Sequence, residues 1–541
     1  MKFFINSADQ IVNEALDGVL TNPTLAKLNN FSEMRVILRK DWNKKKVAII
    51  SGGGSGHEPA HAGFVGKGML TAAVCGDIFA SPSVDAVLSA ILATTGTEGC
   101  LLIIKNYTGD RLNFGLAAEQ ARALGYQVET VTVDDDIALG TDVKKRGLAG
   151  TLFVHKVAGQ LAEEGKSLQE IVEMAQHVIN NTISIGLSLT ECQHLGQEPS
   201  TRLNDHEAEL GLGIHGEPGI EIVPYAQADK LMALAVAKLA RYLPHKEGKY
   251  AMIFNNMGSV SPIEMNILLN SFRKTGLADK IRYVVGPAAF MSSINMNGFS
   301  ISLLSLNKEL EIALLAPAAP LAWQIQAFST PSSVPHPALP KTIPYKASSN
   351  KQVEQLIRSI AELLIASEPE INKLDAKVGD GDAGSTFAQA GKRLLSVLNQ
   401  LPLNNPEKLL SSIGRILSRD AGGSSGVLLS ILFTASGNAY STEQDLGQAF
   451  LQGLKKMSTY GGARVGDRTM IDALQPAFEA LAQQKSLREV AKQARQGADG
   501  TKNIVKTKFG RSAYLPESIL KSIPDPGAEI IARIFERIAA F

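Results

Sequence analysis

The chain contains little cysteine. Three cysteines occur among 541 residues, Cys75, Cys100 and Cys192, and they are far apart and odd in number. This pattern argues against a disulfide framework and against a zinc site built on cysteine. It is typical of a protein that works in a reducing compartment.

Excess charge and long apolar runs are also lacking. The net charge is +1, so no general electrostatic attraction draws the protein to nucleic acid or to an anionic membrane. No apolar stretch approaches the roughly 18 residues of a membrane span. The first ten residues, MKFFINSADQ, hold one lysine and only a short apolar run, which does not match a signal peptide. We therefore expect a cytoplasmic protein with no nucleic-acid or membrane partner.

Proline is concentrated in one segment. Residues 329–349 hold five prolines and little apolar periodicity, which predicts an extended, semi-rigid linker. With 45% apolar and 20% charged residues, the rest is typical of globular protein, and its length suits three or four domains' worth of core.

Before the linker, β-rich apolar runs alternate with helical patterns, which predicts α/β structure with mainly parallel strands. A weaker break in the pattern divides this region into residues 1–183 and 184–328. The runs expected to form strands are Val47–Ile50, Leu101–Ile104, Val128–Val133, Met252–Phe254 and Ile281–Val285.

After the linker, residues 350–541 follow an almost wholly helical pattern. Short turns containing glycine or proline separate the segments, so we expect an all-α bundle. The expected helices are Val353–Ile365, Phe387–Leu398, Leu409–Leu417, Val427–Thr434, Leu446–Met457, Met470–Leu481 and Ala528–Ala539.

The most informative feature is a cluster of three aspartates, Asp375, Asp380 and Asp382, interleaved with glycines. Like charges this close repel one another unless a cation lies among them, and all-oxygen ligands suit Mg²⁺ or Ca²⁺. The glycines end any helix, so the loop can fold the three carboxylates toward one point. The cluster predicts a site for a metal and a polyphosphate. The alternative is a solvated acidic turn between helices.

Other turns of the C-terminal region can bind phosphate. Ser385 is the expected N-cap of a helix, and a Gly-Gly-Ser-Ser-Gly run precedes the helix Val427–Thr434. Arg468 can supply positive charge, and Met470 can pack against a base. Each turn alone would also suit a plain helix cap.

The N-terminal region offers a pocket for a small molecule. A glycine loop, Ser51–Pro59, follows the strand Val47–Ile50 and contains His57. The loop matches neither a Walker A loop nor a dinucleotide-binding fingerprint. Its backbone N–H groups and imidazole suit a small polyhydroxy or carbonyl compound, at the edge of the sheet where α/β folds place ligands. The alternative is a tight turn with a solvated His57.

Two further segments carry reactive side chains. The strand Leu101–Ile104 leads to Lys105 and Asp110, which can hydrogen-bond hydroxyls and remove a proton. His215 lies in a glycine-rich loop, where an accessible imidazole can act as nucleophile, base or ligand. A surface ion pair and a structural histidine are the plainer interpretations.

These motifs, taken in order, resemble those of the dihydroxyacetone kinase family over nearly the whole chain. SGGGSGHEP, IIKNYTGD and GIHGEPG are similar to its K-type substrate domain, and DAKVGDGDAGST, GGSSG, GDRTM, GRSAY and DPG to its L-type nucleotide domain. The resemblance implies a multidomain protein, in which an α/β substrate domain of two subdomains precedes an all-α barrel of eight antiparallel helices. It also implies a homodimer of the single-chain, ATP-dependent type.

For the substrate, the resemblance implies that His215 bonds covalently to the ketone carbon of dihydroxyacetone. Asp110, with His57, would be the general base on the attacking hydroxyl. The implied substrate-binding residues are Gly54, Ser55, Gly56, His57, Lys105 and Asp110.

For the nucleotide, the resemblance implies that Asp375, Asp380 and Asp382 hold two Mg²⁺ ions against the phosphates of ATP. The implied ATP contacts are Ala383, Gly384, Ser385, Thr386, Ser424, Ser425, Gly461, Thr469, Met470, Arg511, Asp525, Pro526 and Gly527.

Three alternatives stay open at this point. The chain could phosphorylate another short sugar, such as glyceraldehyde or erythrulose. It could be a lyase that converts FAD to cyclic FMN and AMP, as in some animal relatives. It could also be a non-catalytic regulator, although such a protein would not need the aspartate cluster.

Overall fold

The computed structural model describes residues 3–28, 34–140, 145–192, 202–339, 341–420, 423–509 and 511–541. The chain forms two compact units, Met1–Ser333 and Val334–Phe541, each of which is described by itself. The boundary falls inside the proline-rich segment 329–349. The end of that segment belongs to the second unit, where Arg419 Nη1 donates to Thr342 Oγ1 at 2.7 Å and Ile343 packs against the core.

The first sheet of the N-terminal unit has six strands in the order β1-β2-β4-β3-β5-β6. The four strands from β4 to β6 pair in parallel, and β1 and β2 add an antiparallel edge. The strands are β1 (Leu25–Lys27), β2 (Arg35–Arg39), β3 (Ala48–Ser55), β4 (Ala72–Ile78), β5 (Cys100–Lys105) and β6 (Val128–Val133).

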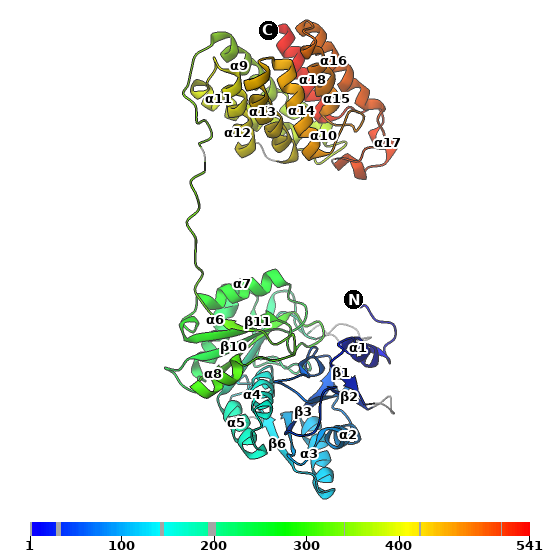
Figure 1. Ribbon diagram of the computed structural model, residues 1–541, viewed down its shortest axis with the longest axis vertical. Helices are drawn as coiled ribbons and strands as arrows, with labels where there is room; N and C mark the ends of the chain where they lie inside the picture. The colour runs from blue at the N-terminus through cyan, green and yellow to red at the C-terminus, as the bar shows by residue number, and fades with distance from the viewer. Residues whose placement is uncertain are drawn as a thin grey trace. The chain divides into compact units, whose positions relative to one another are not determined.

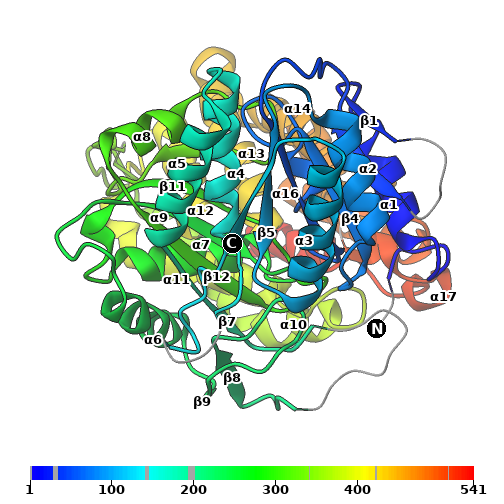
Figure 2. The ribbon, with the colours of Figure 1, turned by 90° about the horizontal axis from the view of Figure 1, so that it is seen from below.

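Both faces of this sheet are buried, which explains the continuous apolar runs of its strands. Ile50 and Leu102 face the cluster that includes α2 (Val84–Thr94) and α3 (Thr108–Ala123). Ile49, Leu101 and their neighbours face the cluster of α4 (Thr151–Glu163) and α5 (Leu168–Asn180). Figure 2 shows α2 and α3 side by side over the sheet. Because β3 and β5 are parallel neighbours, their ends deliver Ser55 and Lys105 to one edge.

The second sheet has seven strands in the order β13-β11-β10-β12-β7-β8-β9. The expectation of mainly parallel strands is wrong here, because only β10 and β11 pair in parallel. The links from β7 to β8, β8 to β9 and β11 to β12 contain no helix among the described residues, so these strands return without a crossover. The strands are β7 (Thr182–Ser188), β8 (Glu207–Leu210), β9 (Glu221–Pro224), β10 (Tyr250–Asn256), β11 (Ile281–Ala288), β12 (Gly298–Ser305) and β13 (Ile325–Ala327).

Helices cover this sheet too. Met252 and Phe254 face the apolar cluster that includes α6 (Ala228–Arg241) and α7 (Pro262–Arg273). Ala251 and Ile253 face the cluster shared with the first sheet, which includes α8 (Lys308–Leu315). One helix, α1 (Ile11–Val19), precedes both sheets, and the suggested division at residues 183 and 184 falls inside β7. That division into two domains stays a prediction.

The second unit is all-helical (Figure 1). Eight long helices pack in succession, and α18 closes the ring against α9. Two shorter helices, α10 and α17, complete the described set. The bounds are α9 (Lys351–Ala366), α10 (Glu368–Asp375), α11 (Ala383–Val397), α12 (Pro406–Asp420), α13 (Gly423–Glu443), α14 (Leu446–Gly461), α15 (Ile471–Ala482), α16 (Leu487–Gly500), α17 (Glu517–Leu520) and α18 (Pro526–Ala540).

All seven helices expected from the sequence are present, as α9, α11 to α15 and α18. The resemblance to an eight-helix barrel agrees with the ring. Among the described helices of either unit, none has the length and apolar character needed to cross a bilayer.

Candidate functional site

The glycine loop at the end of β3 brings a lysine and an aspartate together. Gly53 has φ +151°, and a Cβ there would lie 3.2 Å from Lys105 Nζ and 3.3 Å from Asp110 Oδ2. Glycine is therefore required for this close approach. Lys105 ends β5 and Asp110 lies in the first turn of α3, and both are buried. Burial lowers the pKa of Lys105, and acidic neighbours, Asp110 first, oppose that shift.

His57 is fully buried at the same edge. Its Nδ1 lies 2.8 Å from the main-chain oxygen of Ser292, which can only accept, so Nδ1 carries the proton. The other ring nitrogen, Nε2, has no hydrogen-bond partner among the described residues. Burial, reinforced by the charge of Lys105, holds the pKa of His57 well below its usual range. The ring is thus neutral, and the lone pair of Nε2 is available to take a proton.

His215 lies in the loop between β8 and β9, and it reaches the same place. Its ring centroid is 4.4 Å from that of Tyr107, 4.8 Å from His57 and 5.5 Å from Phe79. His215 Nδ1 lies 3.2 Å from Glu217 Oε1. Burial alone would raise the pKa of Glu217, but the hydrogen bond and charge of His215, together with main-chain hydrogen bonds, lower it to about 2. The carboxylate therefore orients the imidazole with Nδ1 protonated and Nε2 free to attack.

A buried ion pair supports the loop that carries His215. Arg146 Nε donates to Asp136 Oδ2 at 2.7 Å, and Arg146 Nη2 donates to the main-chain oxygen of Gly211 at 2.6 Å. This guanidinium joins the end of the first sheet to the start of the histidine loop, so the first unit builds one site from both of its sheets.

The structure changes the expected surroundings of this site in two ways. His215 is enclosed by three rings, whereas a glycine-rich loop suggested an open imidazole. Ser55 Oγ donates to Gly76 O at 2.8 Å, so its hydroxyl is already used within the protein. The sequence motifs contain Tyr107 and Glu217, but no role was predicted for either residue. Phe79 lies outside these motifs, and nothing in the sequence indicated that it would contact His215.

In the second unit, the three aspartates come together. One carboxylate oxygen from each of Asp375, Asp380 and Asp382 lies within 4.8 Å of the others. Asp375 Oδ2 accepts N–H groups of residues 381 to 383 at 2.9 to 3.2 Å, which holds the loop closed. A Cβ at Gly379 would lie 2.3 Å from Asp375 Oδ1, so only glycine leaves that oxygen room. This donor set of carboxylate oxygens fits Mg²⁺.

The aspartates line a cavity of about 980 Å³. The starts of four helices, α11, α13, α15 and α18, and the ends of α10 and α14 surround it. Helix starts carry the positive end of the helix dipole, so four of them favour a polyanion. The expected nucleotide contacts that line the cavity are Ala383, Thr386, Ser424, Ser425, Gly461, Thr469, Met470, Asp525, Pro526 and Gly527.

Two expected contacts, Gly384 and Ser385, are not among the described residues that line it. Gly384 is buried against Glu368 and Asn372, and Ser385 hydrogen-bonds Asn372. The side chain of Arg511 lies outside the described residues. Ser385 is also not the N-cap, because α11 begins earlier, after Asp382, where Asp375 binds the free N–H groups.

The Gly-Gly-Ser-Ser-Gly run was expected to precede a helix. Instead α13 begins at Gly423, so Ser424 and Ser425 form its first turn. Arg468 was expected to neutralise charge. Its Nη1 donates to two main-chain oxygens, those of Thr501 and Ile523, each at 2.8 Å.

Known proteins show both units joined in this order. The Dak1 domain model matches residues 18–322, and the DAK2 domain model matches residues 377–540. A dihydroxyacetone kinase from Citrobacter freundii is 46% identical, over 99% of this chain and 99% of its own. A triokinase/FMN cyclase from Rattus norvegicus is 38% identical, over 99% of this chain and 98% of its own.

A solved structure matches over the same length. The C. freundii dihydroxyacetone kinase in complex with AMP-PNP and Mg²⁺ has a TM-score of 0.87 and 44% identity, covering 100% of this chain and 99% of that one. The fold is thus that of a two-unit kinase, with an α/β unit followed by a helical one. The chain belongs to the dihydroxyacetone kinase family, in the single-chain form that joins a Dak1 and a DAK2 domain.

Proposed function

We propose that this protein phosphorylates dihydroxyacetone with ATP, giving dihydroxyacetone phosphate. The observation that carries the proposal is the oriented pair of histidines, His57 and His215, joined in one chain to an acidic cavity ringed by helix starts. Full-length identity of 46% to a dihydroxyacetone kinase supports it.

In the first unit, His215 holds the substrate. Nε2 forms a bond to the ketone carbon, the electron pair of the C=O bond moves to oxygen, and that oxygen takes a proton from solvent. The ring keeps its proton on Nδ1 and so becomes a cation, whose charge the Glu217 carboxylate balances. Glycerol has no carbonyl to trap, so this step selects short ketones. Lys105 Nζ, which lacks a hydrogen-bond partner among the described residues, donates to a substrate oxygen.

The hydroxyl that attacks the phosphate must lose a proton. Asp110 is the proposed general base, and His57 Nε2 is placed to assist because its ring is neutral. Main-chain groups of Gly54, Ser55 and Gly56 would line the substrate.

In the second unit, Asp375, Asp380 and Asp382 would hold two Mg²⁺ ions. When bound, Mg²⁺ neutralises negative charge on the transferred phosphoryl group. The starts of α11, α13, α15 and α18 would attract the phosphates with the positive ends of their helix dipoles. A homodimeric assembly and a cytoplasmic location stay predictions.

One assay tests the function. Purified protein with MgATP is given dihydroxyacetone, glyceraldehyde, erythrulose and other three- and four-carbon ketoses and aldoses. We expect the highest kcat/KM with dihydroxyacetone. Failure to phosphorylate any of them would overturn the proposal, and a preference for another sugar would change the substrate alone.

The second candidate is conversion of FAD to cyclic FMN and AMP. The similarity to a triokinase/FMN cyclase favours testing it. This reaction would use the helical unit and would not need His215. His215→Ala should therefore strongly weaken sugar phosphorylation, through a raised KM, and spare FAD cyclisation, if the latter activity is present.

A further inference from the structure

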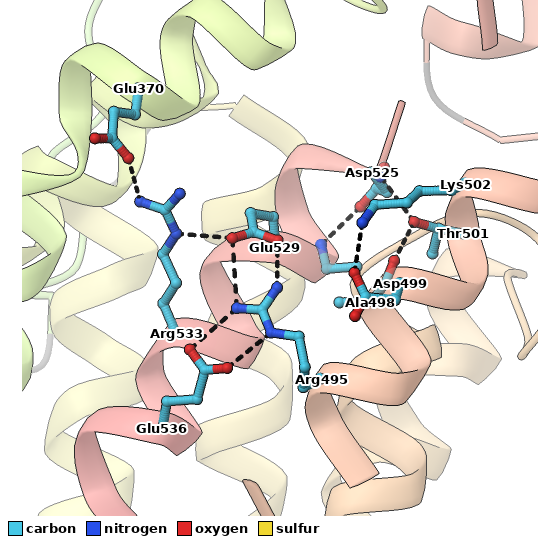
Figure 3. Close-up of polar contacts among 11 residues, drawn as sticks. Glu370, Arg495, Ala498, Asp499, Thr501, Lys502, Asp525, Glu529, Arg533 and Glu536 are labelled. Carbon is cyan, nitrogen blue, oxygen red and sulfur yellow. Dashed lines mark hydrogen bonds and ion pairs between the residues drawn. The ribbon is translucent and has the colours of Figure 1, made fainter. Parts of the chain in front are cut away.

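A buried threonine supports one wall of the nucleotide cavity. Thr501 directly follows α16 and is fully buried. Its Oγ1 donates to the main-chain oxygen of Ala498 at 2.5 Å and accepts the N–H of Asp525 at 2.9 Å. Figure 3 shows the hydroxyl between these two segments. The single hydroxyl thus ties the end of α16 to the N-cap of α18.

The turn that it holds is the Asp525–Gly527 turn, which lines the cavity. Asp525 Oδ2 accepts the N–H of Ala528 at 2.8 Å and so caps α18. The N–H of Asp525 is oriented by Thr501 alone among the contacts described for it. This hydroxyl therefore helps to hold the start of the turn in position.

Arg468 adds a second tie to the same place. It is buried, lines the cavity, and has φ +56°, an unusual value for a residue with a side chain. Its Nη1 donates to the main-chain oxygens of Thr501 and Ile523, which flank the turn. The guanidinium group thus joins its own loop to both segments.

The ion pairs farther along α18 act elsewhere. Arg495 binds Glu529 and Glu536, and Arg533 binds Glu370 at 2.7 Å (Figure 3). The Glu370 side chain is 70% exposed, and such pairs contribute little. They hold α18 to α16 and α10 through side chains from Glu529, in the first turn of α18, onward. None of them bonds the Asp525–Gly527 turn, so they do not replace the buried hydroxyl.

We propose that Thr501, together with Arg468, is a positioning residue for the nucleotide. It fixes the Asp525–Gly527 turn at the cavity wall, so that the turn meets the nucleotide without rearranging. This inference rests on the proposed role of the cavity as the ATP site. None of the motifs quoted from the sequence includes Thr501.

The test compares two substitutions at one position. Thr501→Val keeps the shape and removes the hydroxyl, whereas Thr501→Ser keeps the hydroxyl. Binding of AMP-PNP with Mg²⁺ is measured by calorimetry, and KM is measured for ATP and for dihydroxyacetone. We expect Thr501→Val to weaken AMP-PNP binding and raise the KM for ATP by about three- to tenfold. The KM for dihydroxyacetone should not change, and Thr501→Ser should stay close to wild type.

Thr94→Val is the matched control. Thr94 is equally buried, and its Oγ1 donates to Ala90 O at 2.7 Å in a helix of the first unit. The substitution Thr94→Val removes a comparable hydrogen bond, and AMP-PNP binding should stay at the wild-type value in this variant. Hydrogen exchange gives a local readout, because Thr501→Val should speed exchange in the peptide around Asp525 and not in α15.

Unchanged AMP-PNP binding in Thr501→Val, or an equal loss in Thr94→Val, would overturn the inference. If Thr501→Val does not fold, Arg468→Lys takes its place, since it keeps the charge and loses the guanidinium that spans two oxygens. Unchanged AMP-PNP binding there would also overturn it. Failure of the wild type to bind AMP-PNP would instead refute the proposed function.

Discussion

The two candidate sites differ in how far their ionisable side chains are buried. The first unit buries His57, Lys105 and Asp110 beside an enclosed His215, and burial lowers the pKa of His57 and of Lys105. The second unit leaves Asp380 and Asp382 exposed at a cavity of about 980 Å³. Proton transfer to His57 needs a neutral imidazole, which burial provides. Metal binding needs ionised carboxylates, which burial without a cation would neutralise.

The difference predicts where substitutions act. A change in the buried site should alter sugar binding and pH dependence, whereas a change in the exposed cluster should alter metal and nucleotide use without loosening the fold.

The largest effect is expected for Asp380→Ala. Removing one of three converging carboxylates should lower kcat by about a thousandfold or more, because the metal no longer neutralises the phosphates. The melting temperature should not fall, since Asp380 is exposed. Asp499→Ala is the control, an exposed aspartate of the same unit paired with Lys502. Normal turnover in Asp380→Ala would show that the metal assignment is wrong.

His215→Ala should come next. If His215 binds the ketone as proposed, its loss should raise the KM for dihydroxyacetone by about a hundredfold, equivalent to roughly 2.7 kcal/mol of binding. AMP-PNP binding, measured by calorimetry, should stay at the wild-type value because that site lies in the other unit. Equal weakening of both ligands would mean that the substitution unfolds the protein generally.

Glu217→Gln should have a smaller effect. The amide oxygen can still accept from His215 Nδ1, but the negative charge that favours this tautomer is gone. We expect kcat/KM for dihydroxyacetone to fall by about tenfold. Glu207→Gln serves as the control, because Glu207 begins β8, the strand that leads into the loop of His215 and Glu217. A loss as large as that of His215→Ala would mean that the Glu217 charge has a further role.

Much of this architecture could be predicted from the sequence because each unit has a clear period. Runs such as Leu101–Ile104 predicted the parallel strands of the first sheet, and the helical pattern after the linker predicted seven helices. The helix α16 was missed because its buried residues are mostly alanines, Ala491, Ala494 and Ala498, which carry a weak apolar signal. Antiparallel pairing in the second sheet depends on how the chain returns, which local pattern does not encode.

The candidate sites show a similar limit. Residues inside glycine-rich motifs, such as His57 and Asp375, could be named because glycine and charge together are unusual. Phe79, Arg146 and Thr501 could not, since each acts through contacts with segments far away in sequence. Such residues look like ordinary core or surface positions until the fold brings their partners together.

The smallest effect concerns the pH dependence of stability. It should differ between the two units because the buried histidines lie in the first unit. His57, His61 and His155 are buried in the first unit, whereas residues 350–541 contain no histidine. Burial, with the charge of Lys105, lowers the pKa of His155 to about 3. Below the unfolded value near 6.5, the unfolded state binds one more proton at this position than the folded state. Each such histidine should therefore lower the free energy of unfolding by about 1.4 kcal/mol per pH unit as the pH falls.

Both tryptophans, Trp42 and Trp323, lie in the first unit, so their fluorescence in urea follows that unit alone. Between pH 6 and pH 5, its free energy of unfolding should fall as the pH falls. The slope is set by the number of protons that the unit takes up on unfolding. His155→Leu removes one titrating group, so this number should fall by about one. His336→Leu, an exposed histidine outside the first unit, should leave the slope unchanged. An unchanged slope in His155→Leu would mean that His155 already binds its proton in the folded protein, and the contrast in buried charge between the two units would then be weaker than the structure indicates.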